Sequence, residues 1–386
     1  MYASSKKDIP SLMEKVAAFA ASEIAARPDM NDSDDFPLDI WRKMAREDLF
    51  RLGIPAKYGG TKIAYDTLVL VGEALVNHGH NMGLALSWII HLLASGFVIG
   101  KFGSPSQRRE YLPKMADGLI TASIAFSELG AGADPRYIKT TARREGDHFI
   151  LNGEKAYLTN GPLADFFVVY AVTGVAEGKN QFTAFLVSKD NRNLTVTEVM
   201  KLDFLRPSPH CMIRLENCSV PISAILGREG TALEKMARPC RALEDGLLNG
   251  PILGGMCRQM ELILDGLRKQ GAMPADDVMR GLGEMETRRQ TLRWMACEAA
   301  KRMEEKDGKR ESETLLMSFR AMAADCQSLA AQVMEISGIS MDGELAAMTK
   351  DIRRTLDLLR GGDPSRQKKI GEKIIVRKES NEHIGH

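Results

Sequence analysis

Hydrophobic residues in the first third of the chain recur with the period of an α-helix. Between residues 11 and 26, the apolar positions that share one helix face are Leu12, Val16, Phe19, Ala20 and Ile24. Turn signals follow at 58–60 and 103–105. Polar and glycine residues interrupt the apolar run 82–99, which fits a buried helix better than a membrane span. We therefore expect residues 1–120 to form an N-terminal helical domain.

The pattern changes near residue 121 to short runs of β-branched and aromatic residues. These strand-like runs cover 148–158, 166–172, 182–187, 194–200 and 212–215. Within the first run, Asn152-Gly153 is a hairpin-turn signal between two strand-like halves. The spacing is typical of a small sandwich or barrel of roughly 100 residues. It predicts a middle β domain at 121–230.

Helical periodicity returns from residue 231 onward. Long amphipathic segments cover 278–304, 311–338 and 344–359. They predict a C-terminal bundle of helices at 231–386. The basic stretch 366–378 also contains Glu372 and is read as a solvated helix face. The predicted fold class is therefore α+β, with an N-terminal α-helical domain, a middle small β-barrel or sandwich domain and a C-terminal four-helix bundle.

Composition and charge narrow the classes of function. The 386 residues include 52 basic and 51 acidic side chains, a balance that gives no support for nucleic-acid binding. Six cysteines form no Cys-x-x-Cys pair, and His78-x-His80 has no accompanying carboxylate pattern, so we expect reduced thiols and no metal site. Acidic residues within the first thirty positions disfavour a targeting peptide. We expect a cytoplasmic protein that does not associate with membranes.

The most specific motif lies at 122–165. It reads Ala-Ser-Ile-Ala-Phe-Ser-Glu-Leu-Gly-Ala-Gly-Ala-Asp-Pro from Ala122, and Gly-Asp-His-Phe-Ile-Leu-Asn-Gly-Glu-Lys-Ala-Tyr-Leu-Thr-Asn-Gly from Gly146. Weaker flanking motifs occur at 54–60, 101–118, 220–221 and 226–230. In this order and spacing, the motifs resemble the signature regions of the acyl-CoA dehydrogenase family, whose members are flavoproteins.

The resemblance implies that a base removes the α-proton of an acyl thioester while a hydride leaves the β-carbon for flavin N5. It implies FAD as cofactor, acyl-CoA as substrate, an electron-transfer flavoprotein as electron acceptor, and a homotetramer built as a dimer of dimers. The cofactor-binding positions that it implies are Phe126, Ser127, Gly132, Tyr157, Thr159, Arg268, Gln332 and Gly338. Ser127 would donate a hydroxyl beside the flavin ring, and Thr159 would lie near N5. Without the flanking motifs, an ordinary half-buried strand would be the preferred interpretation of Tyr157 and Thr159.

The catalytic base is predicted at Glu244. Many family members carry the base late in the chain, but 358–364 contains no glutamate here. Other members place it early in the C-terminal domain, and the spacing of 243–254 matches that pattern. Helical geometry supports this choice, because Leu247, Leu248 and Pro251 share the face of Glu244. A carboxylate in an apolar pocket has a raised pKa, which suits proton abstraction. The alternative is a partly exposed helix glutamate.

Two positions that the resemblance links to substrate binding depart from the family pattern. Ala133 replaces a serine that helps to bind the CoA portion of the substrate. Asp245 replaces an arginine and puts a negative charge where CoA recognition is expected. On the predicted helix, Asp245 shares its side with Arg241 and Asn249, so we expect it to be solvated or paired.

The C-terminal cofactor motifs are also altered. Arg268 stands in a shortened version of the segment whose arginine reaches the FAD pyrophosphate of the partner subunit. Gln332 is in place for a cross-subunit FAD contact, but Glu335 replaces a glycine, and Gly338 remains. Asp363 stands where threonine is usual. An anionic Glu335 or Asp363 beside a pyrophosphate would repel it.

These departures leave several functions open. The first is a homotetrameric FAD-dependent acyl-CoA dehydrogenase with Glu244 as base. The second keeps the flavin but acts on an acyl chain held by an acyl-carrier protein, or eliminates a β-substituent without net oxidation. The third is a non-autonomous subunit of a hetero-oligomeric acyl-CoA dehydrogenase, to which this chain supplies only the middle-domain half-site. A structural or nucleic-acid-binding relative is a fourth, and no basic patch supports it.

Overall fold

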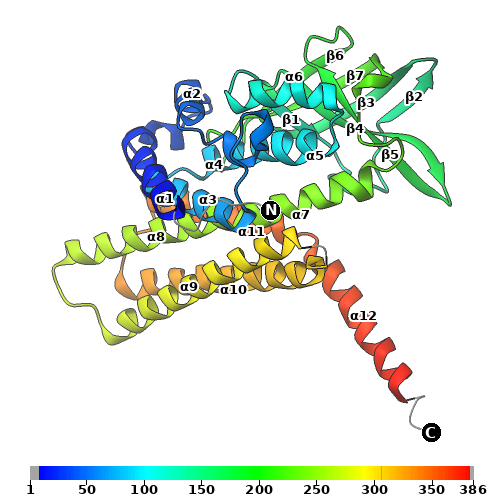
Figure 1. Cartoon of the computed structure of the whole chain (residues 1–386). Helices are drawn as coiled ribbons and strands as arrows, with labels where there is room; N and C mark the ends of the chain where they lie inside the picture. The colour runs from blue at the N-terminus through cyan, green and yellow to red at the C-terminus, as the bar shows by residue number, and fades with distance from the viewer. Residues whose placement is uncertain (1–7, 306, 383–386) are drawn as a thin grey trace.

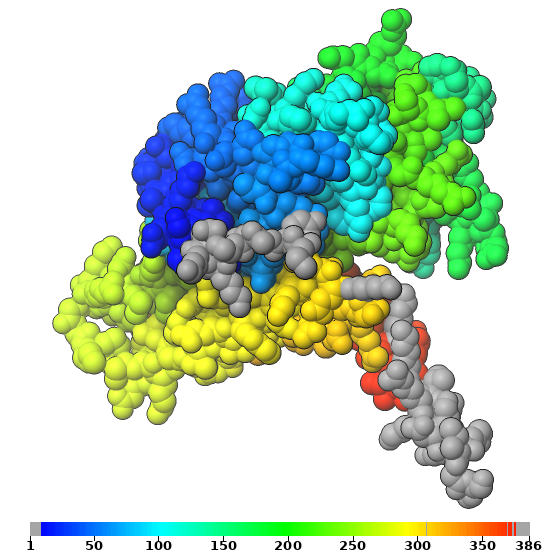
Figure 2. Space-filling view, viewed as in Figure 1, coloured from blue at the N-terminus to red at the C-terminus, as the bar shows by residue number. Residues whose placement is uncertain are grey.

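The chain runs through helices, then strands, then helices again (Figure 1). This computed structural model describes residues 8–305 and 307–382. Residues 1–7, which belong to the stretch in which we expected no targeting peptide, lie outside the described residues. The order of elements confirms the predicted α+β fold class. Figure 2 shows the N-terminal helices and the β domain lying together along one side of the C-terminal helices.

The N-terminal part is helical, as its periodicity predicted. Its α-helices are α1 (Asp8–Phe19), α2 (Leu38–Arg46), α3 (Tyr65–Gly79), α4 (Met82–Leu92), α5 (Gly100–Phe102) and α6 (Pro105–Ala116). Its 3₁₀-helical segments are η2 (Pro28–Asn31), η3 (Arg51–Gly53) and η4 (Ala56–Tyr58), and its π-helical segments are η1 (Ala20–Ile24) and η5 (Leu93–Ile99). Ser104 and Gln107 form a capping box that fixes the start of α6.

The run α4–η5–α5 forms the core of this part. By length and composition Met82–Phe102 could cross a membrane, but 94% of its apolar window is buried inside the protein. The run also approaches η3 very closely. A Cβ built at Gly96 would lie 2.2 Å from the carbonyl oxygen of Gly53, so only glycine permits this contact. The expected buried helix is therefore confirmed.

His91 of α4 is fully buried and packs against the rings of both Trp41 and Phe50. Its Nε2 lies 3.0 Å from the carbonyl oxygen of Met115, and burial lowers its pKa to about 4. The unfolded chain takes up this proton near pH 6.5, so the free energy of unfolding falls as the pH drops from about 6.5 towards 4. At pH 5 we expect a loss of about 2 kcal/mol from this group.

Denaturant unfolding at pH 7.5 and pH 5 measures this effect. His91→Gln should lose about 2 kcal/mol less than the unchanged chain over this interval. The matched control is His148→Gln, because His148 is a half-exposed histidine at the start of a strand. An equal loss in the His91 variant and the unchanged chain would contradict the prediction.

The middle part is one mixed sheet with the strand order β6-β7-β3-β2-β4-β5-β8, and β1 pairs in parallel with β4. Its strands are β1 (Ala122–Ala125), β2 (Thr141–Glu145), β3 (His148–Thr159), β4 (Phe166–Ala176), β5 (Lys179–Ser188), β6 (Leu194–Met200), β7 (His210–Pro221) and β8 (Ile225–Leu226). Short turns η6 (Gly161–Leu163) and η7 (Ile222–Ala224) connect them. Each of the five strand-like runs lies mostly or wholly within one of these strands.

The predicted hairpin turn at Asn152-Gly153 is wrong. Both residues lie inside β3, which continues for 12 residues and pairs along its length with β7. The pairing shifts register between Leu151 and Gly153, where Gly153 has φ +143°. A Cβ there would lie 2.6 Å from the Thr140 hydroxyl, so the glycine serves a β-bulge and a close approach instead of a turn.

The C-terminal part begins with η8 (Leu233–Ala237) and α7 (Arg238–Leu247). The helices α8 (Asn249–Gln270), α9 (Asp276–Glu304), α10 (Lys309–Ser337) and α11 (Gly343–Arg360) follow, with short connections that make sequence neighbours antiparallel. Glycines let α3 pack closely on α8, since a Cβ at Gly250 would lie 2.3 Å from the carbonyl oxygen of Val69. The last helix, α12 (Asp363–Glu382), extends away from the bundle (Figure 1).

Candidate active site

Four of the predicted cofactor residues lie together where the end of β1 meets the last residues of β3, a place here called the sheet edge. Phe126 and Ser127 directly follow β1, while Tyr157 and Thr159 are near the end of β3. The carbonyl oxygen of Ser127 accepts a hydrogen bond of 2.9 Å from the N–H of Ala156. The Ser123 hydroxyl of β1 donates at 2.7 Å to the carbonyl oxygen of Thr159. These two bonds fix the two pairs of residues side by side.

Tyr157 occupies a strained position at this edge. Its backbone has φ +60°, which is uncommon for a residue with a side chain. The pairing of β3 with β7 shifts register between Lys155 and Leu158, so Tyr157 lies in a second bulge. Its ring is 48% exposed. Tyr157 therefore lies exposed in a bulge of β3 and not in a regular half-buried strand.

A buried ion pair beneath this edge was missed from the sequence. Lys155 is fully buried and donates to Glu128 at 3.0 Å and to the carbonyl oxygen of Phe126 at 2.9 Å. Glu128 also accepts from the backbone N–H groups of Lys139 and Thr140 at 2.8 and 2.9 Å. Burial alone would raise the pKa of Glu128, but Lys155 and these hydrogen bonds lower it below its usual range. The pair holds the Phe126–Ser127 segment in place.

The glycine loop next to this ion pair is tight and open to solvent. Glu128 and Gly132 exchange two backbone hydrogen bonds of 3.0 and 2.9 Å. Gly130 and Gly132 have φ +75° and +55°, and a Cβ at either would meet no atom within 4 Å. Backbone conformation therefore explains these glycines, and the space above them is free. Ala133 follows in the same exposed loop.

Glu244 lies on α7 with 22% of its side chain exposed. Burial raises the pKa of its carboxyl group, Arg241 at 3.5 Å opposes this rise, and Asp245 adds to it. The neighbouring residues Leu243 and Leu247 line a cavity of about 20 Å³. Most of the other residues that line this cavity are apolar and come from the N-terminal helices, including η5. The half-buried carboxylate therefore belongs to the same helix turn as two residues that line a small, mainly apolar cavity, but Glu244 does not itself line that cavity.

Packing connects α7 to the sheet edge. The ring centroids of Phe126 and Tyr170 are 5.3 Å apart. Burial, with a smaller contribution from the nearby Cys240 thiol, raises the pKa of the Tyr170 hydroxyl, and Cys240 is one helical turn before Glu244. Met236 and Cys240 belong to the same buried cluster as Tyr170. Cys240 of α7 therefore lies close to Tyr170 of β4, whose ring contacts Phe126.

Asp245 is buried within a cluster of opposite charges at the start of the bundle. Its carboxylate forms ion pairs with Arg241 at 2.8 Å and with Arg366 at 3.7 Å. The predicted substrate-binding position is therefore paired, and its charge is not exposed to solvent. Burial raises its pKa, while the surrounding guanidinium groups oppose the rise.

Asp363 is neutralised in the same cluster. It accepts a bidentate contact from the buried Arg320, whose Nε lies at 2.8 Å, and a further contact from Arg366 at 3.2 Å. The expected repulsion between Asp363 and a pyrophosphate is therefore not supported, because two cations of the same chain already balance its charge. Glu335 is exposed near the end of α10.

The remaining predicted cofactor residues gather at the opposite end of the bundle. Arg268 lies in the last turn of α8 and pairs with Asp265 at 2.8 Å. Gln332 is exposed on the last turns of α10, and Gly338 caps that helix with φ +66°. The α8–α9 connection points away from the sheet in Figure 1, and an α8 of 22 residues is about 33 Å long. One chain does not bring these residues to the sheet edge.

Comparison with known proteins explains why a sheet edge, a helix-borne glutamate and a helical bundle occur together. Residues 7–119 match the acyl-CoA dehydrogenase N-terminal domain, and residues 123–218 match the acyl-CoA dehydrogenase middle domain. The chain belongs to the acyl-CoA dehydrogenase family. The family resemblance inferred from the motifs is therefore confirmed.

Individual acyl-CoA dehydrogenase relatives differ in what they act on. Mitochondrial isovaleryl-CoA dehydrogenase of Oryza sativa subsp. japonica is 32% identical over 58% of this chain and 55% of its own length. This chain thus spans about half the length of the curated relatives that it matches. A crystal structure of an FAD-dependent dehydrogenase has a TM-score of 0.81 at 25% identity, covering 96% and 100% of the two chains. The prolyl acyl carrier protein oxidase AnaB has a TM-score of 0.80 at 26% identity, covering 92% and 95%.

Proposed function

We propose that this protein catalyses the FAD-dependent α,β-dehydrogenation of an acyl thioester, with Glu244 as the base. The observation that carries the proposal is the half-buried Glu244 carboxylate, with its raised pKa, on the helix turn whose Leu243 and Leu247 line the apolar cavity. A base of this kind suits removal of a weakly acidic proton next to a carbonyl group. Family membership supports the reaction class.

The residues at the sheet edge fit a flavin. Ser127 is half-buried, and none of the described residues forms a hydrogen bond with its hydroxyl. Tyr157 presents an aromatic ring, and the open loop at Gly130 and Gly132 leaves space for close backbone approach. Thr159 places a second hydroxyl on the same edge. A donor hydroxyl, an aromatic surface and an open glycine loop are groups that a flavin ring and its phosphates use.

In the proposed reaction, the α C–H bond breaks and its proton moves to a carboxylate oxygen of Glu244. The β-hydrogen leaves with its electron pair, and a double bond forms between the α- and β-carbons. Bound FAD supplies the acceptor for that hydride. Arg241 keeps a positive charge 3.5 Å from the base.

Coenzyme A is the first candidate for the carrier of the acyl group, since the rice relative acts on a CoA thioester by name. A carrier protein is the second candidate. The exposed Ala133 offers no hydroxyl to a CoA chain, and Asp245 is held in an internal charge cluster where the family has an arginine. The similarity to a prolyl acyl carrier protein oxidase over most of both chains favours this second candidate. We propose an electron-transfer flavoprotein as the electron acceptor of the CoA-dependent reaction.

We further propose that the complete cofactor site needs two copies of the chain. Arg268, Gln332 and Gly338 lie at the far end of the bundle from Ser127 and Tyr157, so they would reach the FAD bound by a partner copy. A homotetramer that is a dimer of dimers supplies such pairs. A hetero-oligomer, in which a different subunit supplies this half, remains the alternative.

The visible spectrum of the protein purified alone tests the proposal. We expect a yellow protein whose flavin absorption is bleached by an acyl thioester. Acyl-CoA and the same acyl group on a carrier protein should be compared at equal concentration, because the faster bleaching identifies the carrier. Flavin without bleaching by either thioester would point to elimination chemistry. A colourless protein that takes up no added FAD would support the non-autonomous subunit and overturn the proposal.

A further inference from the structure

His210 has a fixed hydrogen-bond direction. It is the first residue of β7 and lies directly opposite Thr159 of β3 in the antiparallel register. Its Nδ1 is 3.0 Å from the carbonyl oxygen of Ser208, and its Nε2 is 3.0 Å from the Thr159 hydroxyl oxygen. A carbonyl oxygen only accepts, so Nδ1 carries the hydrogen. Burial lowers the pKa of His210, which keeps the imidazole neutral.

The neutral ring therefore leaves Nε2 as an acceptor. The only hydrogen available between Nε2 and Thr159 is that of the threonine hydroxyl, so Thr159 donates to His210. A hydroxyl has one hydrogen to donate and can accept on its other side. Towards any ligand at the sheet edge, Thr159 thus acts as an acceptor only.

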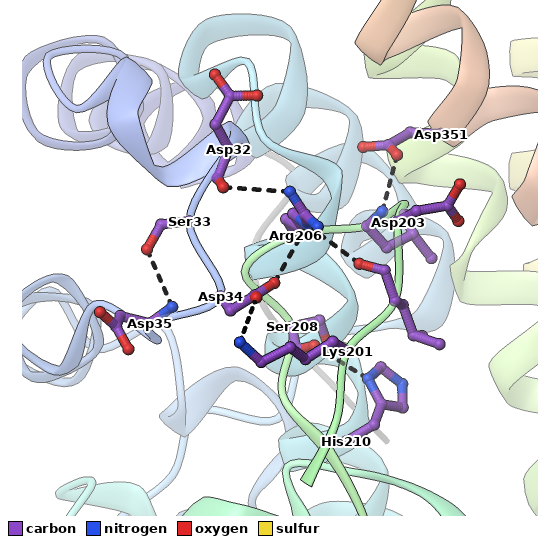
Figure 3. A network of polar contacts seen from close by, with 12 residues as sticks. Asp32, Ser33, Asp34, Asp35, Lys201, Asp203, Arg206, Ser208, His210 and Asp351 are labelled. Carbon is purple, nitrogen blue, oxygen red and sulfur yellow. Dashed lines mark hydrogen bonds and ion pairs between the residues drawn. The ribbon is translucent and has the colours of Figure 1, made fainter.

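The loop before β7 holds the partner of His210 in place (Figure 3). The Ser208 hydroxyl is 3.0 Å from the Ser87 hydroxyl of α4. Arg206 pairs with Asp34 at 3.2 Å and donates to the carbonyl oxygen of Asp32 at 3.2 Å. The N–H of Leu205 donates to Asp351 of α11 at 2.7 Å. Anchors on the N-terminal helices, on the loop before α2 and on the bundle therefore fix the carbonyl group that selects the tautomer of His210.

We propose that His210 is a positioning residue that sets the Thr159 hydroxyl as a hydrogen-bond acceptor towards the flavin. This inference rests on the proposed function, in which Thr159 lies near flavin N5. N5 of an oxidised flavin only accepts a hydrogen bond, whereas N5 of a reduced flavin carries a hydrogen and donates one. An acceptor held at this place stabilises the reduced form relative to the oxidised form. His210 therefore raises the reduction potential of the cofactor without touching it.

The experiment measures the flavin reduction potential in a double-mutant cycle of His210→Phe and Thr159→Val. Phenylalanine keeps a ring but removes the acceptor, so the Thr159 hydroxyl becomes free to donate to N5. We expect His210→Phe to shift the equilibrium about tenfold towards the oxidised flavin, which is about 30 mV for a two-electron couple. In the Thr159→Val background the same change should shift the potential by less than a third of that value. His210→Gln retains a carbonyl oxygen that can accept the hydrogen bond from Thr159. Its reduction potential should therefore stay close to that of the unchanged protein.

A second readout does not depend on the flavin. Nitrogen chemical shifts of the 15N-histidine-labelled full chain, assigned with His210→Gln, should report the Nδ1–H tautomer with and without FAD. The Nε2–H tautomer would overturn the inference, and so would equal potential shifts in the threonine and valine backgrounds. A chain that binds no FAD overturns the proposed function and the role of His210 together, whereas loss of the coupling alone overturns only the latter.

Discussion

Glu244→Gln should abolish dehydrogenation of the acyl thioester while the protein keeps its flavin. Removal of a positioned base typically slows proton transfer by about 10²–10⁴-fold, and the amide of glutamine cannot accept the proton. The side chain keeps its shape and its place beside Arg241, so folding should be unaffected. Single-turnover bleaching of the flavin absorption, together with exchange of the substrate α-hydrogen in heavy water, measures the loss.

Glu234→Gln is the matched control for this variant. Glu234 lies ten residues earlier, in η8, is exposed, and pairs with Arg238 at 2.7 Å. Its replacement should leave the rate within about twofold, since exposed ion pairs contribute little. Undiminished turnover in Glu244→Gln would refute the assignment of the base. Loss of flavin from Glu244→Gln would instead show that the change disturbed the fold of the site.

Lys155→Met should destabilise the folded protein by about 3–5 kcal/mol, because it leaves the buried Glu128 carboxylate without its cation. The carbonyl oxygen of Phe126 also loses its donor. FAD uptake should weaken together with the loss of stability, since the Lys155–Glu128 pair supports the segment that carries Ser127. Denaturant unfolding monitored by circular dichroism gives the change in free energy.

Arg214→Met provides a control on the neighbouring position of the same strands. Arg214 pairs with Glu154 across β3 and β7 at 2.7 Å, and both side chains are 49% exposed. Its loss should cost about 1 kcal/mol or less. The double variant Lys155→Met with Glu128→Gln should recover part of the stability, since it leaves no unpaired buried charge. Equal costs for the two single variants would contradict a special role for the buried pair.

Local pattern alone was enough for most of the secondary structure. Helical periodicity located the long segments that became α9, α10 and α11, because an amphipathic helix must bury one face and so shows its period in the sequence. Five strand-like runs fell in strands for the same reason. The Asn152-Gly153 signal failed, because pairing of β3 with the distant β7 and close contact with Thr140 turned a hairpin motif into a bulge.

In the candidate site, too, local features could be predicted from the sequence, whereas contacts between distant segments could not. Glu244 could be proposed from its spacing and its apolar neighbours, which are local properties of one helix. Arg241 could likewise be proposed as a partner of Asp245 on the same helix. The distant partners of Asp245 and Asp363 could not be proposed, since Arg320 and Arg366 come from α10 and α12, and Arg320 precedes Asp363 by 43 positions. A sequence shows a charge, but its electrostatic effect depends on which opposite charges the fold brings within a few ångströms.

The sequence by itself determined the order of the three parts, most of their helices and strands, and the chemical character of the sheet edge. Tertiary structure alone decided that Lys155 pairs with Glu128, that Tyr157 turns outward at a bulge, and that His210 faces Thr159. It also placed Arg268 and Gly338 away from that edge. The physical reason is that periodicity reports which face of an element is buried, whereas contacts between elements depend on register and packing across long sequence separations.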